Sequence, residues 1–119
     1  MKKTLIIGAS ENPERTTFTA FKKLKANNVE IVLIGNKKGF IDGVEIQIGF
    51  PKIESVHTVT LYISEKHQGE YFQYILDLKP ERVIFNPGTE NLDLELFLKE
   101  HGVHTERECT LVKLSLGLY

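Results

Sequence analysis

The sequence predicts a single α/β domain built on a parallel sheet with helices on both faces. Short apolar runs alternate with segments of helical periodicity, and each run ends at a small or turn-forming residue. Parallel strands need a crossover segment between them, and a helix usually supplies it. A length of 119 residues allows one hydrophobic core and is too short for two sizeable lobes. We therefore expect residues 1–119 to form one domain.

The first unit joins a strand to a helix through one polar loop. Residues 5–7 are apolar on both faces, as expected of a central strand that helices cover on both sides, and Gly8 ends the run. From Arg15 to about Ala26 the period becomes helical. The apolar positions of this helix are Phe18, Phe21 and Leu24.

The middle of the chain predicts two more core strands, over residues 30–34 and 58–63. Between them, residues 40–50 show no helical pattern, because Val44, Ile46 and Ile48 alternate with polar residues. This alternation predicts a short edge strand or ribbon between the second and third core strands.

The last third of the chain predicts two helices and two strands. Residues 68–78 have a helical stripe that Pro80 prevents from continuing, and residues 82–85 form the fourth strand. Residues 92–98 alternate as in a strand. Their lack of β-branched residues and a cap at Thr89 or Asn91 favour a helix.

A fifth strand is predicted near residues 103–106, with Leu111 and Val112 packing after it. The predicted fold is thus a sheet of about five parallel strands, with the ribbon as an addition.

Composition excludes several classes of function. Fifteen basic and 16 acidic side chains leave almost no net charge, which argues against non-specific binding to nucleic acid or to membranes. The apolar run near the N-terminus is too short for a secretory signal, and no later run is long enough to cross a membrane. A single cysteine, Cys109, cannot form an internal disulfide. We expect a soluble, complete, cytoplasmic chain.

The loop after the first strand is the strongest candidate for an anion site. It joins a buried strand to the start of a helix, so that free amides and the helix dipole point to one place. Gly8 would let the backbone come close, Ser10 and Thr16 could donate hydroxyl hydrogen bonds, and Arg15 could bind phosphate through its guanidinium. A purely structural alternative is that Asn12 caps the helix and Pro13 begins it.

Two lysines follow the second predicted strand. A protein that binds NAD usually has an acidic residue there, whereas this chain has Asn36, Lys37 and Lys38. Two ammonium groups favour a ribose that carries an extra phosphate, as in coenzyme A or NADP. A pair of solvated lysines with no ligand is the alternative.

These residues together resemble a family. The stretch 8–15, with Gly-Ala-Ser, Asn-Pro and Arg, the region 36–39, the ribbon at 43–44, the turn at 86–88 and Cys109 occur in matching order in the small stand-alone CoA-binding proteins. Those proteins are similar to the CoA-binding domain of the succinyl-CoA synthetase α subunit. The resemblance covers nearly the whole chain and implies a Rossmann-like fold.

The resemblance also implies a cofactor, coenzyme A or an acyl-CoA. The first loop would hold its diphosphate, Lys37 or Lys38 its ribose phosphate, and the ends of the third and fourth strands would flank adenine and pantetheine. The predicted cofactor-binding residues are Gly8, Ala9, Ser10, Asn12, Arg15, Thr16, Asn36, Lys37, Lys38, Tyr62, Ile63, Ser64, Asn86, Pro87 and Gly88. This chain departs from its relatives at residues 35–36, where they often have Asn-Pro, and at residues 64–67, where they often have an arginine-rich stretch. These differences remove cations from the expected site.

The function predicted first is a binding module that holds CoA or acyl-CoA through the ADP part, with no catalytic residues and no nucleic-acid or membrane partner. One alternative is a minimal NADP-dependent reductase. Another is an interaction protein that kept the fold without the ligand. Because an exposed strand at a sheet edge invites pairing, the ribbon could also support a homodimer.

Several reactive side chains are predicted to have structural roles. We expect Cys109 to be a buried thiol, the alternatives being a nucleophile or a mixed disulfide with the CoA thiol. The four histidines do not form a metal-binding pattern, and His101 is expected to meet the negative end of its own helix. Glu11 and Glu14 are expected to face solvent.

Overall fold

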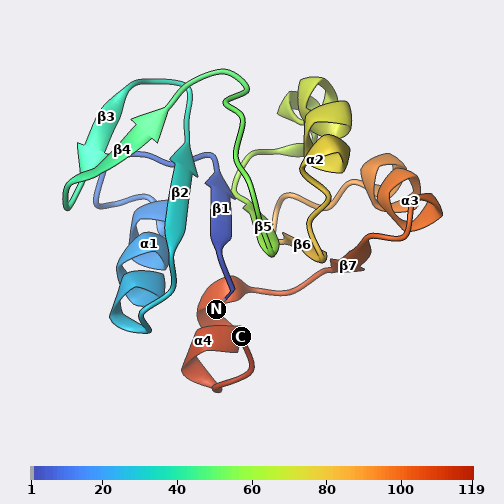
Figure 1. The fold of residues 1–119 in the computed structure, drawn as a ribbon. Helices are drawn as coiled ribbons and strands as arrows, with labels where there is room; N and C mark the ends of the chain where they lie inside the picture. The colour runs from blue at the N-terminus through green and yellow to red at the C-terminus, as the bar shows by residue number, and fades with distance from the viewer. Residues whose placement is uncertain (1) are drawn as a thin grey trace.

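Strand β1 (Thr4–Ile7) lies inside a seven-stranded sheet in a computed structural model that describes residues 2–119 (Figure 1). The strand order is β3-β4-β2-β1-β5-β6-β7. All neighbouring strands pair in parallel except β3 and β4, which form an antiparallel hairpin. The other strands are β2 (Ile31–Ile34), β3 (Gly39–Ile41), β4 (Val44–Gln47), β5 (Thr58–Leu61), β6 (Arg82–Phe85) and β7 (His104–Glu106).

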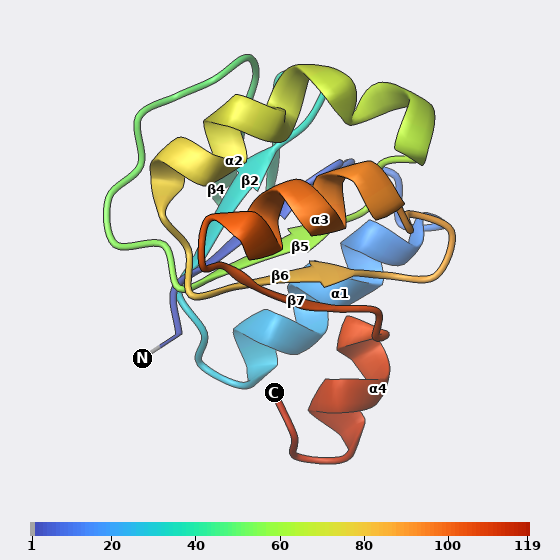
Figure 2. The same ribbon diagram turned by 90° about the vertical axis from the view of Figure 1, so that its right-hand side faces the viewer.

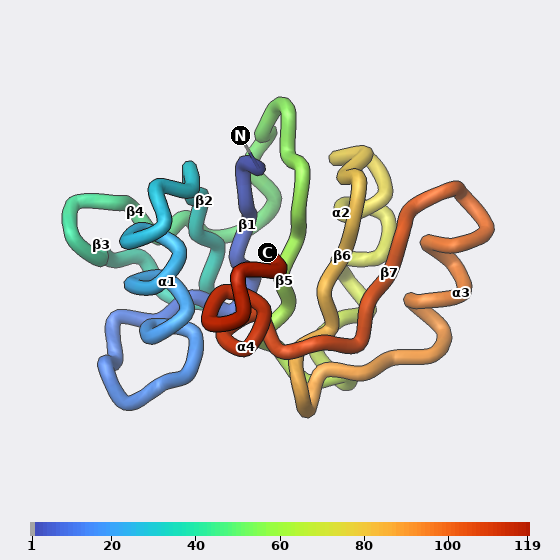
Figure 3. Tube along the Cα trace, turned by 90° about the horizontal axis from the view of Figure 1, so that it is seen from below, coloured from blue at the N-terminus to red at the C-terminus, as the bar shows by residue number. Residues whose placement is uncertain are grey.

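Helices cover both faces of this sheet. Helices α2 (Phe72–Leu78) and α3 (Leu92–Glu100) lie on one face, and α1 (Thr16–Ala26) and α4 (Thr110–Ser115) lie side by side on the other (Figures 2 and 3). Alternate residues of β1 serve the two cores, because Leu5 packs in the α2 and α3 core and Ile6 in the α1 core. This arrangement confirms the predicted α/β class and explains why residues 5–7 are apolar on both faces.

The sheet is larger than the five strands that the sequence predicts. The predicted ribbon is the hairpin β3–β4, and β4 pairs in parallel with β2 through the register Leu33↔Ile46 and Ile34↔Gln47. The ribbon therefore extends the main sheet. Period-2 alternation indicates a strand but does not indicate its partner, which is why the count differs.

Two predicted helices begin later than expected. Helix α1 starts at Thr16, and the segment predicted as a helix from Gln68 starts with two 3₁₀ turns, η1 (Glu65–His67) and η2 (Gly69–Tyr71), before α2. The third strand also ends early, at Leu61. The helix predicted over residues 92–98 is confirmed as α3, and of its two candidate caps Asn91 is the one used, because its Oδ1 accepts the amide of Leu94 at 3.1 Å.

Helix α4 was not predicted. The sequence predicted only that Leu111 and Val112 would pack after the last strand, and for Val112 this is wrong because the residue is 51% exposed. The fully buried residue is Thr110, which begins the helix. A six-residue helix is too short for its period to stand out in the sequence.

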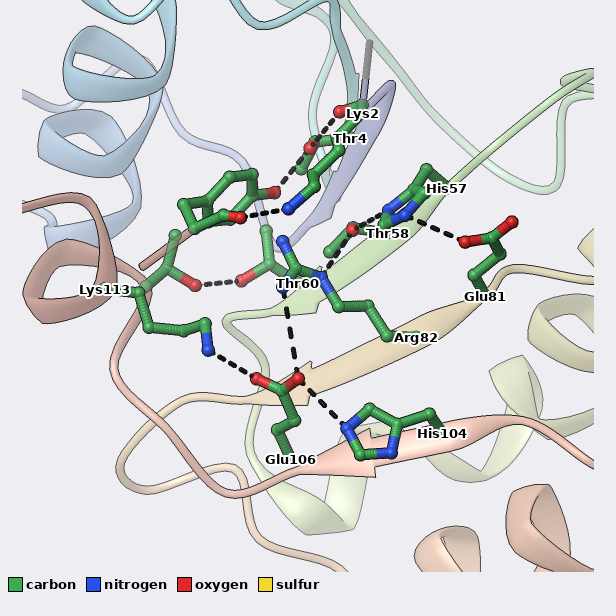
Figure 4. A network of polar contacts seen from close by, with 12 residues as sticks. Lys2, Thr4, His57, Thr58, Thr60, Glu81, Arg82, His104, Glu106 and Lys113 are labelled. Carbon is green, nitrogen blue, oxygen red and sulfur yellow. Dashed lines mark hydrogen bonds and ion pairs between the residues drawn. The ribbon is translucent and has the colours of Figure 1, made fainter. Parts of the chain in front are cut away.

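A buried arginine holds the C-terminal segment against the sheet. Arg82 of β6 donates from Nε to the Thr58 hydroxyl at 2.8 Å, and its guanidinium carbon lies 4.4 Å from the centre of the Tyr119 ring. Nearby, Lys113 of α4 pairs with Glu106 of β7 at 2.9 Å (Figure 4). These contacts fix α4 next to the strands whose ends form the site described below.

The chain path reverses its direction across the sheet at β1. From β1 it passes through α1 to β2 on one side, and after the hairpin it returns to β5 on the other side of β1. In open α/β sheets, ligands bind beyond the carboxyl ends of the strands at such a switch point. Within residues 2–119, no helix has the length and apolar character needed to span a membrane.

Candidate functional site

A cleft of about 820 Å³ opens at the carboxyl ends of β1, β5 and β6. It lies at the switch point of the sheet, where the sequence predicted the site. Most of the predicted cofactor-binding residues line it together. They are Gly8, Ala9, Ser10, Arg15, Thr16, Asn36, Tyr62, Ile63, Ser64, Asn86, Pro87 and Gly88.

The remaining predicted residues lie outside this cleft. Asn12 and Lys37 line a smaller depression of about 230 Å³ that shares Ala9, Ser10 and Asn36 with the cleft. Lys38 is exposed and lines neither. The two lysines are therefore not equivalent, and Lys37 is the one beside the first loop.

The first loop is folded by its own backbone contacts. The amides of Gly8 and Ala9 both donate to the carbonyl of Ile34 at 2.9 Å, so these two amides are used within the protein. Gly8 has a φ of +105°, and a Cβ there would lie 2.9 Å from the backbone of Tyr62. Gly8 is thus required for the close approach of two strand ends, a reason that the sequence did not indicate.

Within residues 2–119, the amides of Ser10, Thr16 and Thr17 have no acceptor, and all three residues line the cleft. The amide of Glu11 also has none, but Glu11 lines the smaller depression instead. Thr16 and Thr17 are the first two residues of α1, so the positive end of the helix dipole lies with these amides. The arrangement is suited to an anion.

The hydroxyl of Thr17 strengthens this assignment, and sequence reasoning missed it. Thr17 is only 5% exposed, and its buried Oγ1 has no hydrogen-bond partner within residues 2–119. A buried polar atom without a partner is costly, so such atoms in a cleft usually meet a ligand or water. A threonine inside a helix gives no sequence signal of this kind, because its burial is decided by the neighbouring elements.

The alternative that Asn12 caps α1 is wrong. Arg15 occupies the cap position, and Asn12 instead accepts the amide of Glu14 at 3.0 Å within a turn. The Asn12 amide in turn donates to the Ser10 hydroxyl at 3.1 Å. Arg15 is exposed and forms no ion pair in the part of the chain described, so its guanidinium is available to a ligand.

Glu11 is exposed, as expected, but its carboxylate is also bonded within the protein. Its Oε2 accepts the amide of Phe40 at 3.0 Å, and its carboxyl group lies over Gly39, where a Cβ would be 2.4 Å from Cδ. The side chain thereby joins the first loop to the β3–β4 hairpin. Glu14 is exposed, as predicted.

The opposite wall of the cleft is held by buried amide side chains. Gln68 is completely buried and donates from Nε2 to the carbonyls of Ile63 at 2.9 Å and Thr89 at 2.7 Å. Its Oε1 accepts from Asn91 at 3.0 Å. Gln68 thus fixes the loops after β5 and β6 relative to one another. Sequence reasoning missed it, because a polar residue at a predicted helix start is usually exposed.

Five more residues that the sequence did not select for the site also line the cleft. They are Gly35, His67, Glu70, Tyr71 and Thr89. His67 is exposed at the rim, and Glu70 places a carboxylate beside the space. The cleft is therefore mixed in charge away from the first loop.

Cys109 is half-buried and lines the same cleft. The expectation of a buried thiol is therefore wrong: the residue stands at the N-cap position of α4, makes no side-chain cap, and is partly exposed at the cleft. Tyr62 lies close by. Burial raises the pKa of Tyr62 to about 12, the nearby hydroxyls of Thr110 and Thr60 act in the opposite direction, and a thiolate at Cys109 would raise it further. The Tyr62 hydroxyl thus stays protonated at neutral pH.

Three of the four histidines, His57, His101 and His104, make separate local contacts. His101 contacts the Phe97 carbonyl at 2.8 Å at the end of α3, as predicted, while His57 pairs with Glu81 at 3.0 Å. Within residues 2–119, no group of three or more His, Cys, Asp or Glu side chains is placed to hold a metal ion.

Comparison with known proteins places the chain in a family. A family model described as a CoA binding domain matches residues 2–115. A solved structure described as an uncharacterized protein is 49% identical with a TM-score of 0.97, and the match covers 100% of this chain and 98% of that one. No curated protein matches.

More distant structures share the fold. A hypothetical protein from Pyrococcus horikoshii OT3 is 21% identical with a TM-score of 0.89, over 99% of this chain and 84% of that one. A structure described as cell-free ID.343 from Thermus thermophilus is 16% identical with a TM-score of 0.87, over 99% of this chain and 90% of that one. With the family model covering almost its whole length, this chain belongs to the CoA binding domain family.

Proposed function

We propose that this protein binds coenzyme A or an acyl-CoA through the ADP part of the ligand, as a binding module without catalytic residues of its own. The observation that carries the proposal is the group of unpaired donors at one mouth of the cleft. Within the part of the chain that the structure describes, no partner is found for the amides of Ser10, Thr16 and Thr17, for the Thr17 hydroxyl or for the Arg15 guanidinium.

This donor set fits a diphosphate. Backbone amides at a helix start and one guanidinium supply hydrogen bonds and positive charge without a metal ion. Gly8 and Ala9 shape the loop, since their own amides are already bonded to Ile34. Membership of the CoA binding domain family supports CoA as the source of the diphosphate.

The smaller depression is suited to the ribose phosphate. It adjoins Ser10 and Asn36, and Lys37 supplies an ammonium group there. Glu11 also lines it, but the Glu11 carboxylate is held by the amide of Phe40 at 3.0 Å. We assign the ribose 3′-phosphate to Lys37, with Asn12 forming part of the same wall. Lys38 would act at longer range, because it lines neither space.

The far half of the cleft would take the pantetheine arm. Its walls include Tyr62, Ile63, Ser64, Pro87 and Gly88, which mix apolar and hydroxyl groups. Such a lining suits an arm made of amide and methylene groups. Asn86 contributes by holding the wall, because its side-chain amide is bonded within the protein.

A thermal titration tests the proposal. CoA and 3′-phospho-ADP should each raise the melting temperature, because a ligand that binds only the folded state stabilises it by mass action. NADPH should raise it much less. Equal shifts with NADPH would favour a reductase, and no shift with any nucleotide would favour an interaction protein.

A matched pair of α1 variants sharpens this test. Arg15→Gln should weaken CoA binding about 10-fold, since a hydrogen bond to a charged group contributes about 1.5 kcal/mol or more. Lys23→Gln removes a positive charge from the last turn of the same helix, away from the cleft, and should leave the affinity unchanged. Equal losses in both variants would indicate only a general charge effect.

We further propose a cytoplasmic location, and a homodimer through the β3–β4 hairpin. Phe40, in the edge strand β3, is 62% exposed, which is compatible with pairing between two copies. Equilibrium sedimentation of the protein and of Phe40→Glu tests the dimer, which predicts a smaller mass for the variant.

A further inference from the structure

The only cysteine of the chain opens into the proposed ligand cleft. Cys109 precedes α4 with an extended backbone, at φ −99° and ψ 116°, and is half-buried. It lines the cleft together with Pro87 and Gly88, in the half that we assign to the pantetheine arm. The thiol of CoA stands at the end of that arm.

The position of Cys109 is fixed by the residue that follows it. The Thr110 amide donates to Asn86 Oδ1 at 2.9 Å, and the Thr110 hydroxyl contacts the Thr60 hydroxyl at 2.8 Å. Thr110 is fully buried, so the chain cannot easily shift at this point. Cys109 is therefore held at the strand ends as part of the cleft wall.

An independent observation indicates that the same cleft takes a ligand. Thr17 lines it, is only 5% exposed, and has a buried Oγ1 without a partner in the described chain. This hydroxyl lies at the start of α1, whereas Cys109 lies at the start of α4. One cleft thus combines an unsatisfied donor for the phosphate end of a ligand with a thiol for its other end.

We infer that Cys109 is a site of covalent attachment for CoA, formed by thiol–disulfide exchange with a disulfide of CoA bound in the cleft. The inference rests on the proposed function, because the bound ADP part is what would bring the ligand disulfide to Cys109. The ligand, which otherwise binds reversibly, would then stay covalently bound until a thiol reductant cleaves the disulfide.

The exchange balances without a further oxidant. The Cys109 thiolate attacks one sulfur of CoA disulfide, a new S–S bond forms, and the original S–S bond breaks. One CoA leaves as a thiolate and takes up the proton that Cys109 lost. The ligand disulfide is reduced to one free thiol while Cys109 is oxidised to the mixed disulfide.

Intact-protein mass spectrometry with CoA disulfide tests the inference. The expected product has gained the mass of one CoA minus two hydrogen atoms, and dithiothreitol reverses it. Binding through the ADP part raises the local concentration of the disulfide, so the reaction should be at least about 10-fold faster than with glutathione disulfide. An excess of 3′-phospho-ADP should slow the reaction with CoA disulfide and leave the reaction with glutathione disulfide unchanged.

Two variants separate positioning from simple reactivity. Cys109→Ser should form no adduct, while 3′-phospho-ADP, which lacks the pantetheine arm, should still raise its melting temperature. Arg15→Gln should slow the reaction with CoA disulfide and leave the rate with glutathione disulfide unchanged, because only the former depends on phosphate contacts.

The outcomes distinguish this inference from the proposed function. If CoA raises the melting temperature but CoA disulfide gives no adduct, or reacts no faster than glutathione disulfide, covalent attachment is overturned and the binding function stands. If CoA has no thermal effect and 3′-phospho-ADP gives no protection, both proposals fail.

Discussion

Asn86 Oδ1 accepts a hydrogen bond from the backbone amide of Thr110 at 2.9 Å, which joins the end of β6 to the start of α4. The other end of the same side chain donates to the Thr60 hydroxyl at 2.6 Å and to the Leu61 carbonyl at 2.8 Å. Both ends of the amide are therefore used inside the protein. The contact with Thr110 determines where Cys109 stands at the cleft.

Replacing this amide by a carboxylate should destabilise the fold. In Asn86→Asp, the oxygen that replaces Nδ2 would face the Leu61 carbonyl with no hydrogen to share, and a buried charge would have no cation to pair with. We expect the free energy of unfolding to fall by about 3 kcal/mol in urea denaturation. Asn36→Asp, an exposed position of the same cleft, should change it by less than about 0.5 kcal/mol.

Two of the three glycines that line the cleft, Gly8 and Gly88, should differ in their tolerance of alanine. Gly8→Ala combines a φ of +105° with a Cβ only 2.9 Å from the Tyr62 backbone, so we expect a loss of about 3 kcal/mol. Gly88→Ala, at φ +91° with open space around it, should lose only about 1 kcal/mol. Equal losses would show that backbone conformation, rather than the close approach to Tyr62, makes Gly8 necessary.

Removing the Thr17 hydroxyl should affect stability and binding in opposite directions. Thr17→Val removes a buried oxygen without a partner, so the unliganded protein should be as stable as the wild type or more stable by about 1 kcal/mol, while CoA binds more weakly. Thr110→Val removes a paired hydroxyl and should cost about 1 kcal/mol. Denaturation with and without CoA measures both. An unchanged affinity in Thr17→Val would remove that hydroxyl from the site.

The two lysines after β2 should contribute unequally to ligand choice. Replacing both Lys37 and Lys38 by glutamate should abolish the discrimination between CoA and dephospho-CoA. Because only Lys37 lines the smaller depression, Lys37→Glu by itself should remove most of that preference, about 10-fold in relative affinity, and Lys38→Glu little of it. Calorimetric titration of each variant with both ligands provides the comparison. Discrimination that survives the double replacement would place the ribose phosphate elsewhere.

The contact between β7 and α4 should weaken in acid. Burial acts to raise the pKa of Glu106, but the neighbouring cations, Lys113 first among them, outweigh it and lower the pKa below its usual value. A carboxyl group with a lowered folded-state pKa stabilises the fold above its unfolded pKa, and this contribution is lost as the pH falls through the folded value. The stability difference between wild type and Glu106→Gln should therefore shrink between about pH 7 and about pH 3. A constant difference over that range would contradict the assignment.

Much of the fold followed from local patterns that the structure confirms. The apolar runs gave the core strands, and the capping residue Asn91 with the Leu-rich segment after it gave α3 despite a misleading alternation. The predictions failed where the structure depends on which strands pair, or where an element is very short. The hairpin β3–β4 joined the main sheet through β2, and α4 formed where six residues carry too little periodicity to be recognised.

In the candidate site, too, some features were predictable from local sequence and others were not. The loop from Gly8 to Thr16 was predictable, because a strand, a glycine and a helix start stand in sequence there. Gln68, Thr17 and the exposure of Cys109 were not, since each depends on elements distant in the chain.

By itself, the sequence determined the α/β class, the first βα loop and the family resemblance, because these depend on periodicity and on motifs within short stretches of chain. Only the tertiary structure decided which hydrogen-bond donors are left unpaired, which lysine lies beside the first loop, and that the Cys109 thiol lines the cleft. The physical reason is that burial and hydrogen-bond pairing are set by contacts between residues far apart in sequence, and local pattern does not encode them.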